Sequence, residues 1–358
     1  MIDEAGLRWA AAMRRGAFDA AHAISDVVLA NRNPSARDDP GLPYHLRWVW
    51  DGRDLAGRDV LVRCYHGLGD TIQFARFLPL LRQRAARVTV EVQPELVGLL
   101  ARMRGPDRLI PFQPDKPARP AERDVEIMEL AHALRLDPGA ISVPYLVAPP
   151  APIGVSDRLN VGLCWRAGDW DSARSVPPAA LRAACDQPRV HAWSLQYRST
   201  NEEAEAASLD RFHAYRSDPI IVIAGLDPAI NPAAARCRHI DARIKSGHDG
   251  RGAGGLSESA LSCALPPGAD VMAIASAIAG LDLIVTIDTM VAHLAGALGK
   301  QTWLLLRREC DWRWMERRTD SPWYPSMRLY RQNIEGDWRA PLERLAADLR
   351  LRARAAEC

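Results

Sequence analysis

The spacing of hydrophobic and polar residues changes repeatedly along the chain between two patterns. Short apolar runs, which are typical of buried strands, are followed by segments whose apolar residues recur every three or four positions, as in amphipathic helices. This alternation runs from residue 60 to about 147 and resumes at 159. Strands that alternate with helices are typical of parallel sheets, so we predict an α/β protein with two facing nucleotide-fold domains.

Domain boundaries are predicted where this alternation stops. Residues 1–43 read as a short helical arm followed by a polar, proline-rich linker, and residues 44–150 as the first α/β domain. Residues 151–335 read as the second domain. Residues 336–358 read as a terminal helix that docks on a core, with the first domain as one candidate surface. A stretch rich in Gly, Pro and charge interrupts the second domain at about 209–267, and we interpret it as an insertion.

Composition and charge narrow the class of protein. A chain of 358 residues that is 48% hydrophobic can bury large cores. Its 46 basic and 44 acidic residues leave a net charge of +2, which predicts no binding to nucleic acid. Seven cysteines without a Cys-x-x-Cys pair favour reduced thiols in a cytoplasmic protein over disulfides or zinc. The N-terminus lacks a long apolar run, so we expect neither a signal peptide nor a membrane span, and any association with the inner membrane to be peripheral.

The segment 283–299 is the strongest candidate for a ligand-binding corner. An apolar strand ends there at Asp288 and Thr289, and a helix that carries His293 begins at once. The free N–H groups at a helix start, together with the helix dipole, favour a bound phosphate. This corner therefore predicts an anion-binding edge in the second domain.

A second corner of the same design lies in the first domain. In residues 59–81 a strand leads through a glycine-rich turn, with Gly67, Gly69 and Asp70, into an amphipathic helix. Ligands of open α/β sheets bind at such strand ends. Two corners of this kind predict one cleft between the two domains.

Four stretches that include these corners resemble glycosyltransferase family 9, the heptosyltransferase-like group of bacterial enzymes. They are HGLGDTIQFARFLP, the VGLCWRAG strand with Arg174-Ser175 downstream, SLQ at 194–196, and DTMVAHLAGALGKQTWLLL followed by DWRW and SPWYPSMRLYRQ. The resemblance covers roughly residues 58–208 and 268–345. It implies a GT-B type fold, in which two Rossmann-like domains hold the donor between them, and an inverting transfer without a bound metal.

The N-terminal arm is similar to half of one tetratricopeptide repeat. The similar segment, RRGAFDAAHAISDVVLANRNP, points to family members that are fused to such repeats. Because a single repeat cannot bury its apolar face alone, we expect the arm to pack on the next domain.

The resemblance implies that Asp70 is the general base. It takes the proton of the acceptor hydroxyl as that oxygen attacks the anomeric carbon. The alternative is that Asp70 only caps the helix that follows, and one carboxylate can do both. Gly67 and Gly69 are expected to adopt positive φ and to let the backbone approach the sugar, or to serve only the local turn.

The remaining candidates belong to the donor side. The resemblance implies that Arg174 clamps the diphosphate that leaves, whereas an exposed arginine is often only solvated. Asp288 and Thr289 are expected to meet the sugar and phosphate of the donor, or only to cap a helix. His293 either donates to a phosphate or hydroxyl or is a hydrogen-bonded core histidine. Gln196, at the end of a strand, is a candidate for substrate contact.

Two further groups of polar residues have an ambiguous pattern. The loop 311–325 is dense in Trp and Arg, so it either stacks a nucleobase, shapes an acceptor groove, or packs as an ordinary loop. Glu126 and Glu129, on a predicted helix of the first domain, either face an acceptor or are solvated glutamates on the helix surface, and we do not include them as candidates.

The sequence thus predicts a glycosyltransferase without a cofactor. Its donor would be a nucleotide-diphosphate sugar, and its acceptor a glycan, a lipid-linked molecule or a protein, most simply in synthesis of envelope polysaccharide or lipopolysaccharide. A non-catalytic binding or scaffold protein on the same fold is a second hypothesis. A sugar-nucleotide epimerase, which converts free donor without an acceptor, is a third.

Overall fold

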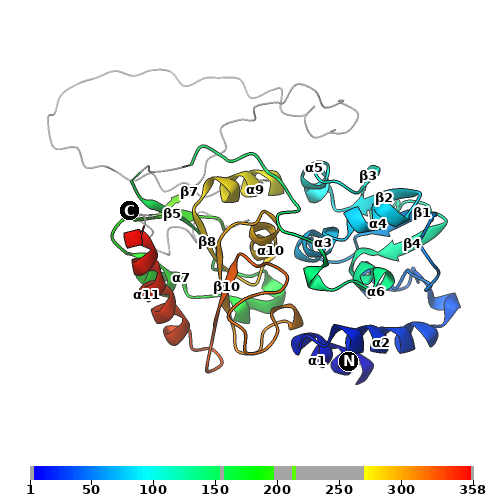
Figure 1. Ribbon diagram of the computed structural model, residues 1–358, viewed down its shortest axis with the longest axis horizontal. Coiled ribbons are helices and arrows are strands. Elements are labelled where there is room, and N and C mark those ends of the chain that lie inside the picture. Colours follow the sequence, from blue (N-terminus) through cyan, green and yellow to red (C-terminus); the bar gives the residue numbers. More distant parts are fainter. Residues whose placement is uncertain (1–3, 154–156, 197–211, 215–269, 356–358) are drawn as a thin grey trace, which may run out of the picture.

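The computed structural model describes residues 4–153, 157–196, 212–214 and 270–355. In these residues the chain forms two parallel sheets flanked by helices, and a helical hairpin lies along the lower edge in the view of Figure 1. The predicted α/β fold with two parallel sheets is confirmed. We call the parts built on the first and second sheets the first and second lobes. None of the helices in this part of the chain combines the length and the apolar character that crossing a membrane requires.

The first lobe contains a four-stranded sheet in the order β3-β2-β1-β4, with every pairing parallel. Its strands are β1 (Asp59–Arg63), β2 (Arg87–Val92), β3 (Arg108–Pro111) and β4 (Arg123–Glu126). Its helices are α3 (Leu68–Ala75), α4 (Leu78–Arg84), α5 (Val97–Leu100) and α6 (Leu130–Leu134). The central strands β1 and β2 are rich in valine and almost entirely buried, because helices cover both faces of such a sheet. Arg63 pairs with Glu126, so the carboxyl ends of β1 and β4 lie side by side.

The second lobe contains a six-stranded sheet in the order β10-β9-β8-β5-β6-β7, again with parallel pairings. Its strands are β5 (Leu159–Leu163), β6 (Val190–Ser194), β7 (Phe212–Ala214), β8 (Leu283–Ile287), β9 (Thr302–Leu306) and β10 (Met327–Arg331). Its helices are α7 (Pro178–Cys185), α9 (Val271–Gly280), α10 (Met290–Ala297) and α11 (Arg339–Ala355). β8 lies between β5 and β9, so the corner that follows it opens at the middle of the sheet's carboxyl edge.

Short 3₁₀ helices make several of the connections. They are η1 (Pro34–Ala36), η2 (Tyr44–Leu46), η3 (Pro94–Leu96), η4 (Ile127–Glu129), η5 (Pro138–Ala140), η6 (Asp169–Arg174) and η8 (Trp312–Trp314). η6 and η8 each carry an arginine of the candidate site, and η4 directly follows Glu126. The connections therefore matter more for the site than their length suggests.

Two parts of the second lobe bear on the sequence predictions. Strand β7 lies inside the stretch 209–267 that we interpreted as an insertion, yet it pairs with β6, and the rest of that stretch lies outside the described residues. Helix α11 packs on α7 and β10 (Figure 1), so docking on the first domain is wrong. Its apolar face, with Leu342, Leu345 and Leu349, completes the core of the second lobe.

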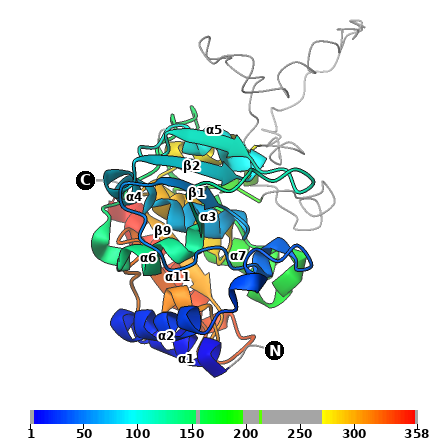
Figure 2. The same cartoon turned by 90° about the vertical axis from the view of Figure 1, so that its right-hand side faces the viewer.

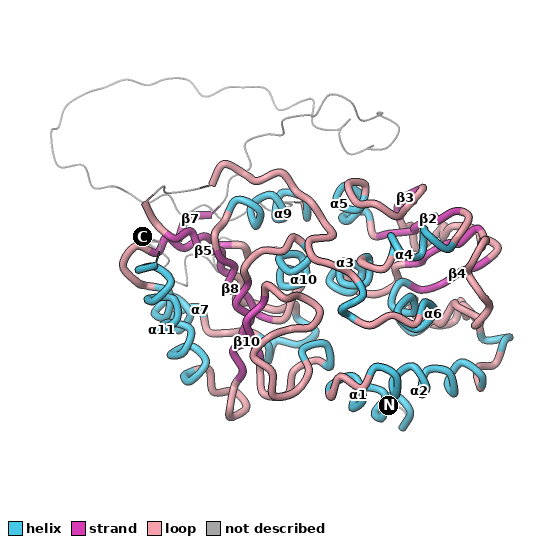
Figure 3. Tube along the Cα trace, viewed as in Figure 1, coloured by secondary structure: helices cyan, strands magenta, loops and turns pink. Residues whose placement is uncertain are grey.

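The two lobes pack directly against each other where α3 faces α10 (Figure 3). Arg76, at the end of α3, is fully buried and donates to the carbonyl oxygens of Trp323 at 2.5 Å and Pro138 at 3.3 Å. Its guanidinium lies over the rings of Tyr145 and Tyr324, at 4.9 and 5.0 Å from their centroids. Cations over aromatic faces are stabilised further when water is excluded, so this residue ties the lobes together.

The N-terminal arm consists of two helices that pack side by side. They are α1 (Glu4–Arg14) and α2 (Phe18–Ala30). The ring of Trp9 contacts that of Trp312 in the second lobe, with centroids 4.9 Å apart, and Nε2 of His132 in the first lobe hydrogen-bonds to Oδ1 of Asp26 at 2.8 Å. In Figure 1 the arm runs beneath the first lobe, and α1 ends next to the second lobe, where it contacts η8; Figure 2 shows the arm at the bottom of the molecule. The arm therefore packs on both domains and not only on the next one.

Candidate active site

The two corners predicted from the sequence meet where α3 packs against α10. Gly69 lies in the first turn of α3, and a Cβ atom at this position would lie 2.9 Å from Cδ2 of His293. Only glycine permits so close an approach. Gly67 has φ of −69°, and Gly69 also lacks a positive φ, so the predicted positive φ is wrong. Gly69 instead lets the helices of the two lobes touch.

Asp70 stands at this contact with both carboxylate oxygens engaged. Oδ2 accepts a hydrogen bond from the backbone N–H of Gly67 at 3.1 Å, which is the helix-capping interaction. Oδ1 accepts from Nη2 of Arg313, a residue of the second lobe. The side chain keeps 27% of its surface exposed. The capping alternative is thus present in the structure, together with an ion pair that crosses between the lobes.

Arg313 is a site residue that the sequence analysis missed. It lies in η8, is 8% exposed, and donates from Nε to Oε1 of Gln73 at 2.7 Å and from Nη1 to Oδ1 of Asp311 at 2.9 Å. The Trp- and Arg-rich loop was a visible signal. Nothing in its pattern shows which arginine turns inward.

Glu126 is a second missed residue, and the prediction that it lies on a solvated helix surface is wrong. It ends β4, is 2% exposed, and accepts from the backbone N–H of Met128 at 2.7 Å. Burial raises the pKa of its carboxyl well above the usual range. The Nε2 atom of His66 lies 3.9 Å from its Oε2 atom. Its position at the end of a strand beside β1 would have indicated this role, but that position can be recognised only once the order of the strands in the sheet is known.

Arg174 lies across from these residues, in the second lobe. Its Nη1 atom donates to the backbone oxygen of Asp288 at 2.7 Å and lies 3.9 Å from the carboxylate Oδ2 of the same residue. Its Nε atom lies 3.4 Å from Oδ2 of Asp171. The arginine is therefore held at the end of β8, beside the predicted anion-binding corner.

Asp288 is buried at this corner, with 8% of its surface exposed. Burial raises the pKa of its carboxyl to about 6, the charge of Asp311 raises it further, and Arg174 opposes both effects. A carboxyl of this kind changes its charge near neutral pH. The negative charge next to the start of α10 is therefore small in mildly acidic solution.

Thr289 is the N-cap residue of α10, with extended backbone at φ −147° and ψ 177°. Its hydroxyl donates to the backbone oxygen of Ile287 at 3.4 Å and makes no capping hydrogen bond to the helix. A helix start without a side-chain cap presents its N–H groups to a ligand.

His293, one turn into α10, is 5% exposed and stacks on Trp314 with ring centroids 5.3 Å apart. Its Nδ1 atom shares a hydrogen bond of 3.0 Å with the hydroxyl of Tyr324. Burial lowers the pKa of the imidazole well below its usual value, and nearby arginines add to this. The ring is therefore neutral and has the surroundings of a core histidine.

Gln196 lies behind Thr289, and its amide binds the chain itself. Oε1 accepts from the backbone N–H groups of Trp165 at 3.2 Å and Arg166 at 2.9 Å, and Nε2 donates to the oxygen of Arg166 at 3.2 Å. Cys164 connects the two residues, with its sulfur 3.7 Å from Gln196 Oε1 and 3.8 Å from Thr289 Oγ1. The glutamine thus fixes the loop after β5.

Charged side chains link the two sides of the junction. Asp70 contacts Arg313, Arg313 contacts Asp311, and the charges of Asp311 and Arg313 both act on Asp288, which Arg174 holds. The structure therefore brings the candidate base of the first lobe and the candidate clamp of the second lobe to one place.

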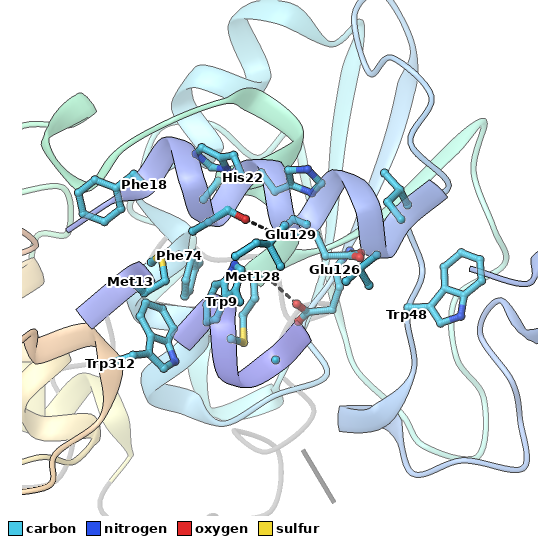
Figure 4. A pocket seen from close by; sticks show the side chains of 18 of the residues that line it. Trp9, Met13, Phe18, His22, Trp48, Phe74, Glu126, Met128, Glu129 and Trp312 are labelled. Carbon is cyan, nitrogen blue, oxygen red and sulfur yellow. Dashed lines mark hydrogen bonds between the residues drawn. The ribbon is translucent and has the colours of Figure 1, made fainter. Parts of the chain in front are cut away.

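A cavity of about 350 Å³ lies between the arm and the first lobe, next to this junction. Its lining is mostly apolar and includes Trp9, Met13, Phe18, Phe74 and Trp312 (Figure 4). His66, one residue before Gly67, also lines it. We call it the arm cavity.

Comparison with known proteins places the fold. No protein-family model matches the chain. Protein FlbA of Caulobacter vibrioides is 25% identical over 330 residues, which cover 84% of this chain and 48% of FlbA. The chain thus spans about half of the length of the curated relative it matches.

Solved structures resemble the chain in fold. E. coli ADP-heptose lipopolysaccharide heptosyltransferase II matches with a TM-score of 0.50 at 14% identity, over 84% of this chain and all of that one. A glycosyltransferase of family 9 from Veillonella parvula matches with a TM-score of 0.48 at 10% identity, over 84% of this chain and 99% of that one. The likeness to the E. coli enzyme confirms the predicted GT-B type fold, with two parallel-sheet lobes.

Proposed function

We propose that the chain is a glycosyltransferase, which moves a sugar from a nucleotide-diphosphate donor to an acceptor. One observation carries the proposal. In a fold like that of a heptosyltransferase, Asp70 and Arg174 lie on opposite lobes, and a chain of charged side chains connects them. An inverting transfer needs a base on the acceptor side and positive charge on the donor side of the same sugar.

On the first lobe, Asp70 accepts the proton of the acceptor hydroxyl while the hydroxyl oxygen attacks the anomeric carbon. An ionised carboxylate has about four lone-pair positions, and Gly67 and Arg313 occupy two of them. The two hydrogen bonds fix the orientation of the carboxylate, and the remaining positions stay available for the hydroxyl. Orientation of this kind is what proton transfer in a closed site requires.

On the second lobe, the bond between the anomeric carbon and the diphosphate oxygen breaks as the new bond forms. The electron pair leaves with the nucleoside diphosphate, so negative charge grows beside Arg174 and the start of α10. The guanidinium and the helix N–H groups stabilise that charge without a bound metal. Thr289 adds a hydroxyl, and Asp288, His293 and Gln196 shape the pocket wall or contact the donor.

The donor and acceptor are proposed only by class. The E. coli relative is named for ADP-heptose and lipopolysaccharide, and we carry over a nucleotide-diphosphate sugar and an acceptor of the bacterial envelope, which is a glycan, a lipid-linked molecule or a protein. We propose that the reaction takes place in the cytoplasm. We also propose an arm related to tetratricopeptide repeats at 1–43, an acceptor domain at 44–150, a donor domain at 151–335, and a terminal helix at 336–358.

The donor side is tested by titrating the chain with ADP, GDP, UDP and CDP in a calorimeter. We expect one of them to bind, and Arg174→Ala to weaken that binding at least tenfold, because a hydrogen bond to a charged group contributes about 1.5–3 kcal/mol. Arg350→Ala, on the exposed face of α11, is the matched control and should bind as the wild type does. Equal affinity of the Arg174 and Arg350 variants would refute the clamp.

The base is tested after a screen of nucleotide sugars has identified a donor. Asp70→Asn keeps an oxygen for the helix cap, so it should fold and bind the nucleotide while transfer falls by about 10²–10⁴-fold. Asp311→Asn, which removes another carboxylate from Arg313, separates loss of the base from loss of the ion pair and should keep most of the activity. Loss of binding with transfer intact in Asp70→Asn would contradict the assignment.

A non-catalytic binding protein is the second candidate, and one observation favours it. The carboxylate of Asp70 is already engaged by a cap and an ion pair, which is also how a purely structural aspartate is held. If the chain binds a nucleoside diphosphate but neither transfers nor hydrolyses any nucleotide sugar, this candidate is the correct one.

A further inference from the structure

We propose that the arm cavity binds an uncharged alkyl chain that is attached to the acceptor. The inference rests on the proposed function, because it assigns the acceptor to the lipid-linked class. Its test measures binding in the absence of a donor. Failure of that test would therefore leave the donor-side proposal standing.

The arm cavity extends along α2. Residues on one face of this helix, from Phe18 through His22 and Ser25 to Leu29, all line it. They recur every three or four positions, so the cavity follows the helix for roughly 16 Å at about 1.5 Å per residue. A cavity of about 350 Å³ that extends along a helix in this way matches the extended shape of an alkyl chain.

Most of the lining of this channel is apolar. Figure 4 shows Trp9, Met13 and Trp312 gathered at one end, with Phe74 near them and Trp48 at the other end. The rings come from the arm, the first lobe and the second lobe. Removing methylene groups from water into such a lining is favourable, in proportion to the apolar area that is buried.

The lining presents no uncompensated charge among the described residues. Arg32 is paired with Glu129 at 2.8 Å, and His132 with Asp26 at 2.8 Å. Burial lowers the pKa of His22 and raises that of Glu126, so each favours its neutral form. Arg47 and His66 complete the set of titratable groups in the lining, and burial lowers the pKa of His66 as well. The arm cavity therefore favours an uncharged occupant.

The composition of the lining suits an alkyl chain better than a peptide. Each buried peptide residue brings one N–H and one C=O group that need partners. Most of the lining is apolar, so it offers few partners to a row of such groups. An alkyl chain needs none.

The arm cavity also reaches the candidate base. His66, in its lining, directly precedes Gly67, whose N–H group binds Asp70, and Phe74 lies one turn further along α3. Trp312 lines the opposite side and adjoins Arg313, the other partner of Asp70. An alkyl chain in the channel would thus place the group it carries next to Asp70.

The test uses n-alkyl β-D-glucosides from butyl to octyl, each below its micelle concentration, with binding followed by tryptophan fluorescence and calorimetry. We expect Kd to fall roughly fourfold per added methylene, the equivalent of about 0.8 kcal/mol. Octanoate should bind at least tenfold more weakly than octyl glucoside, because its charged head would lie next to the carboxylate of Asp70 and would lose water at the apolar channel. Affinity that does not depend on chain length, or tighter binding of a blocked Phe-Leu-Phe peptide, would overturn the proposal.

Variants that fill the channel locate the site. Ser25→Phe on α2 and Ala131→Leu on α6 place extra volume into the lining, and each should weaken octyl glucoside binding at least tenfold. Val27→Phe, on the exposed face of the same α2 helix, is the matched control and should bind as the wild type does. Thermal melting verifies that each variant is folded. If either folded filling variant binds like the control, the ligand lies elsewhere and the proposal fails.

Discussion

Replacing Asp288 by asparagine should change the pH dependence of stability in a direction that the structure determines. The folded carboxyl has a pKa of about 6, against an ordinary value of 3.8, chiefly because it is buried. Its contribution to stability is therefore fully present below pH 3.8 and is lost as pH rises through 6. The difference in pKa corresponds to about 3 kcal/mol at pH 8, since one pKa unit is worth about 1.4 kcal/mol. Asparagine has nearly the same shape and leaves the backbone oxygen that Arg174 binds.

The assay is urea unfolding of the wild type and the variant at intervals from pH 4 to pH 8. We expect the free energies of unfolding to be similar near pH 4, and the variant to be more stable by up to about 3 kcal/mol at pH 8. Asp59→Asn, an exposed carboxylate on β1, is the control, and its difference from the wild type should stay within about 0.5 kcal/mol. A difference for Asp288→Asn that is flat with pH, or that grows toward low pH, would refute the reasoning.

Two further predictions concern packing. Gly69→Ala places a Cβ atom 2.9 Å from His293, so it should lower the free energy of unfolding by about 1–3 kcal/mol. The control, Gly98→Ala in α5, meets no atom within 4 Å and should be neutral or stabilising in thermal melts. Equal effects of the two substitutions would show that the lobes can separate freely at Gly69. Arg63→Met leaves two buried carboxylates without their cation and should cost about 3–5 kcal/mol in urea unfolding. A loss below about 1 kcal/mol would mean that water already reaches this ion pair.

The two-lobe architecture could be predicted because it depends on local patterns. The apolar runs of β1 and β8, and the amphipathic segments that follow them, indicate buried strands and helices through the spacing of their hydrophobic residues alone. Asp70 and Thr289 stand at helix starts, which the change of period also marks. The candidate residues at these corners could therefore be identified from the sequence.

The contacts that complete the site could not be predicted from the sequence. Arg313 contacts Asp70 although 243 positions separate them along the sequence. The Trp- and Arg-rich loop contains other arginines, and its composition does not show which of them makes this contact. Glu126 became a buried residue only through the order of the strands, which puts β4 beside β1. The positive φ predicted for Gly69 failed for a similar reason, because the need for glycine comes from His293 on another lobe.

The sequence by itself determined where strands and helices begin and which corners carry polar groups, because hydrophobic period and helix capping act between residues close along the chain. Only the tertiary structure decided that the arm spans both lobes, that Arg313 pairs with Asp70, and that a channel runs along α2 toward that pair. Those features depend on how separately formed surfaces fit together. Such a fit is a property of packed side chains far apart in sequence, which no local pattern encodes.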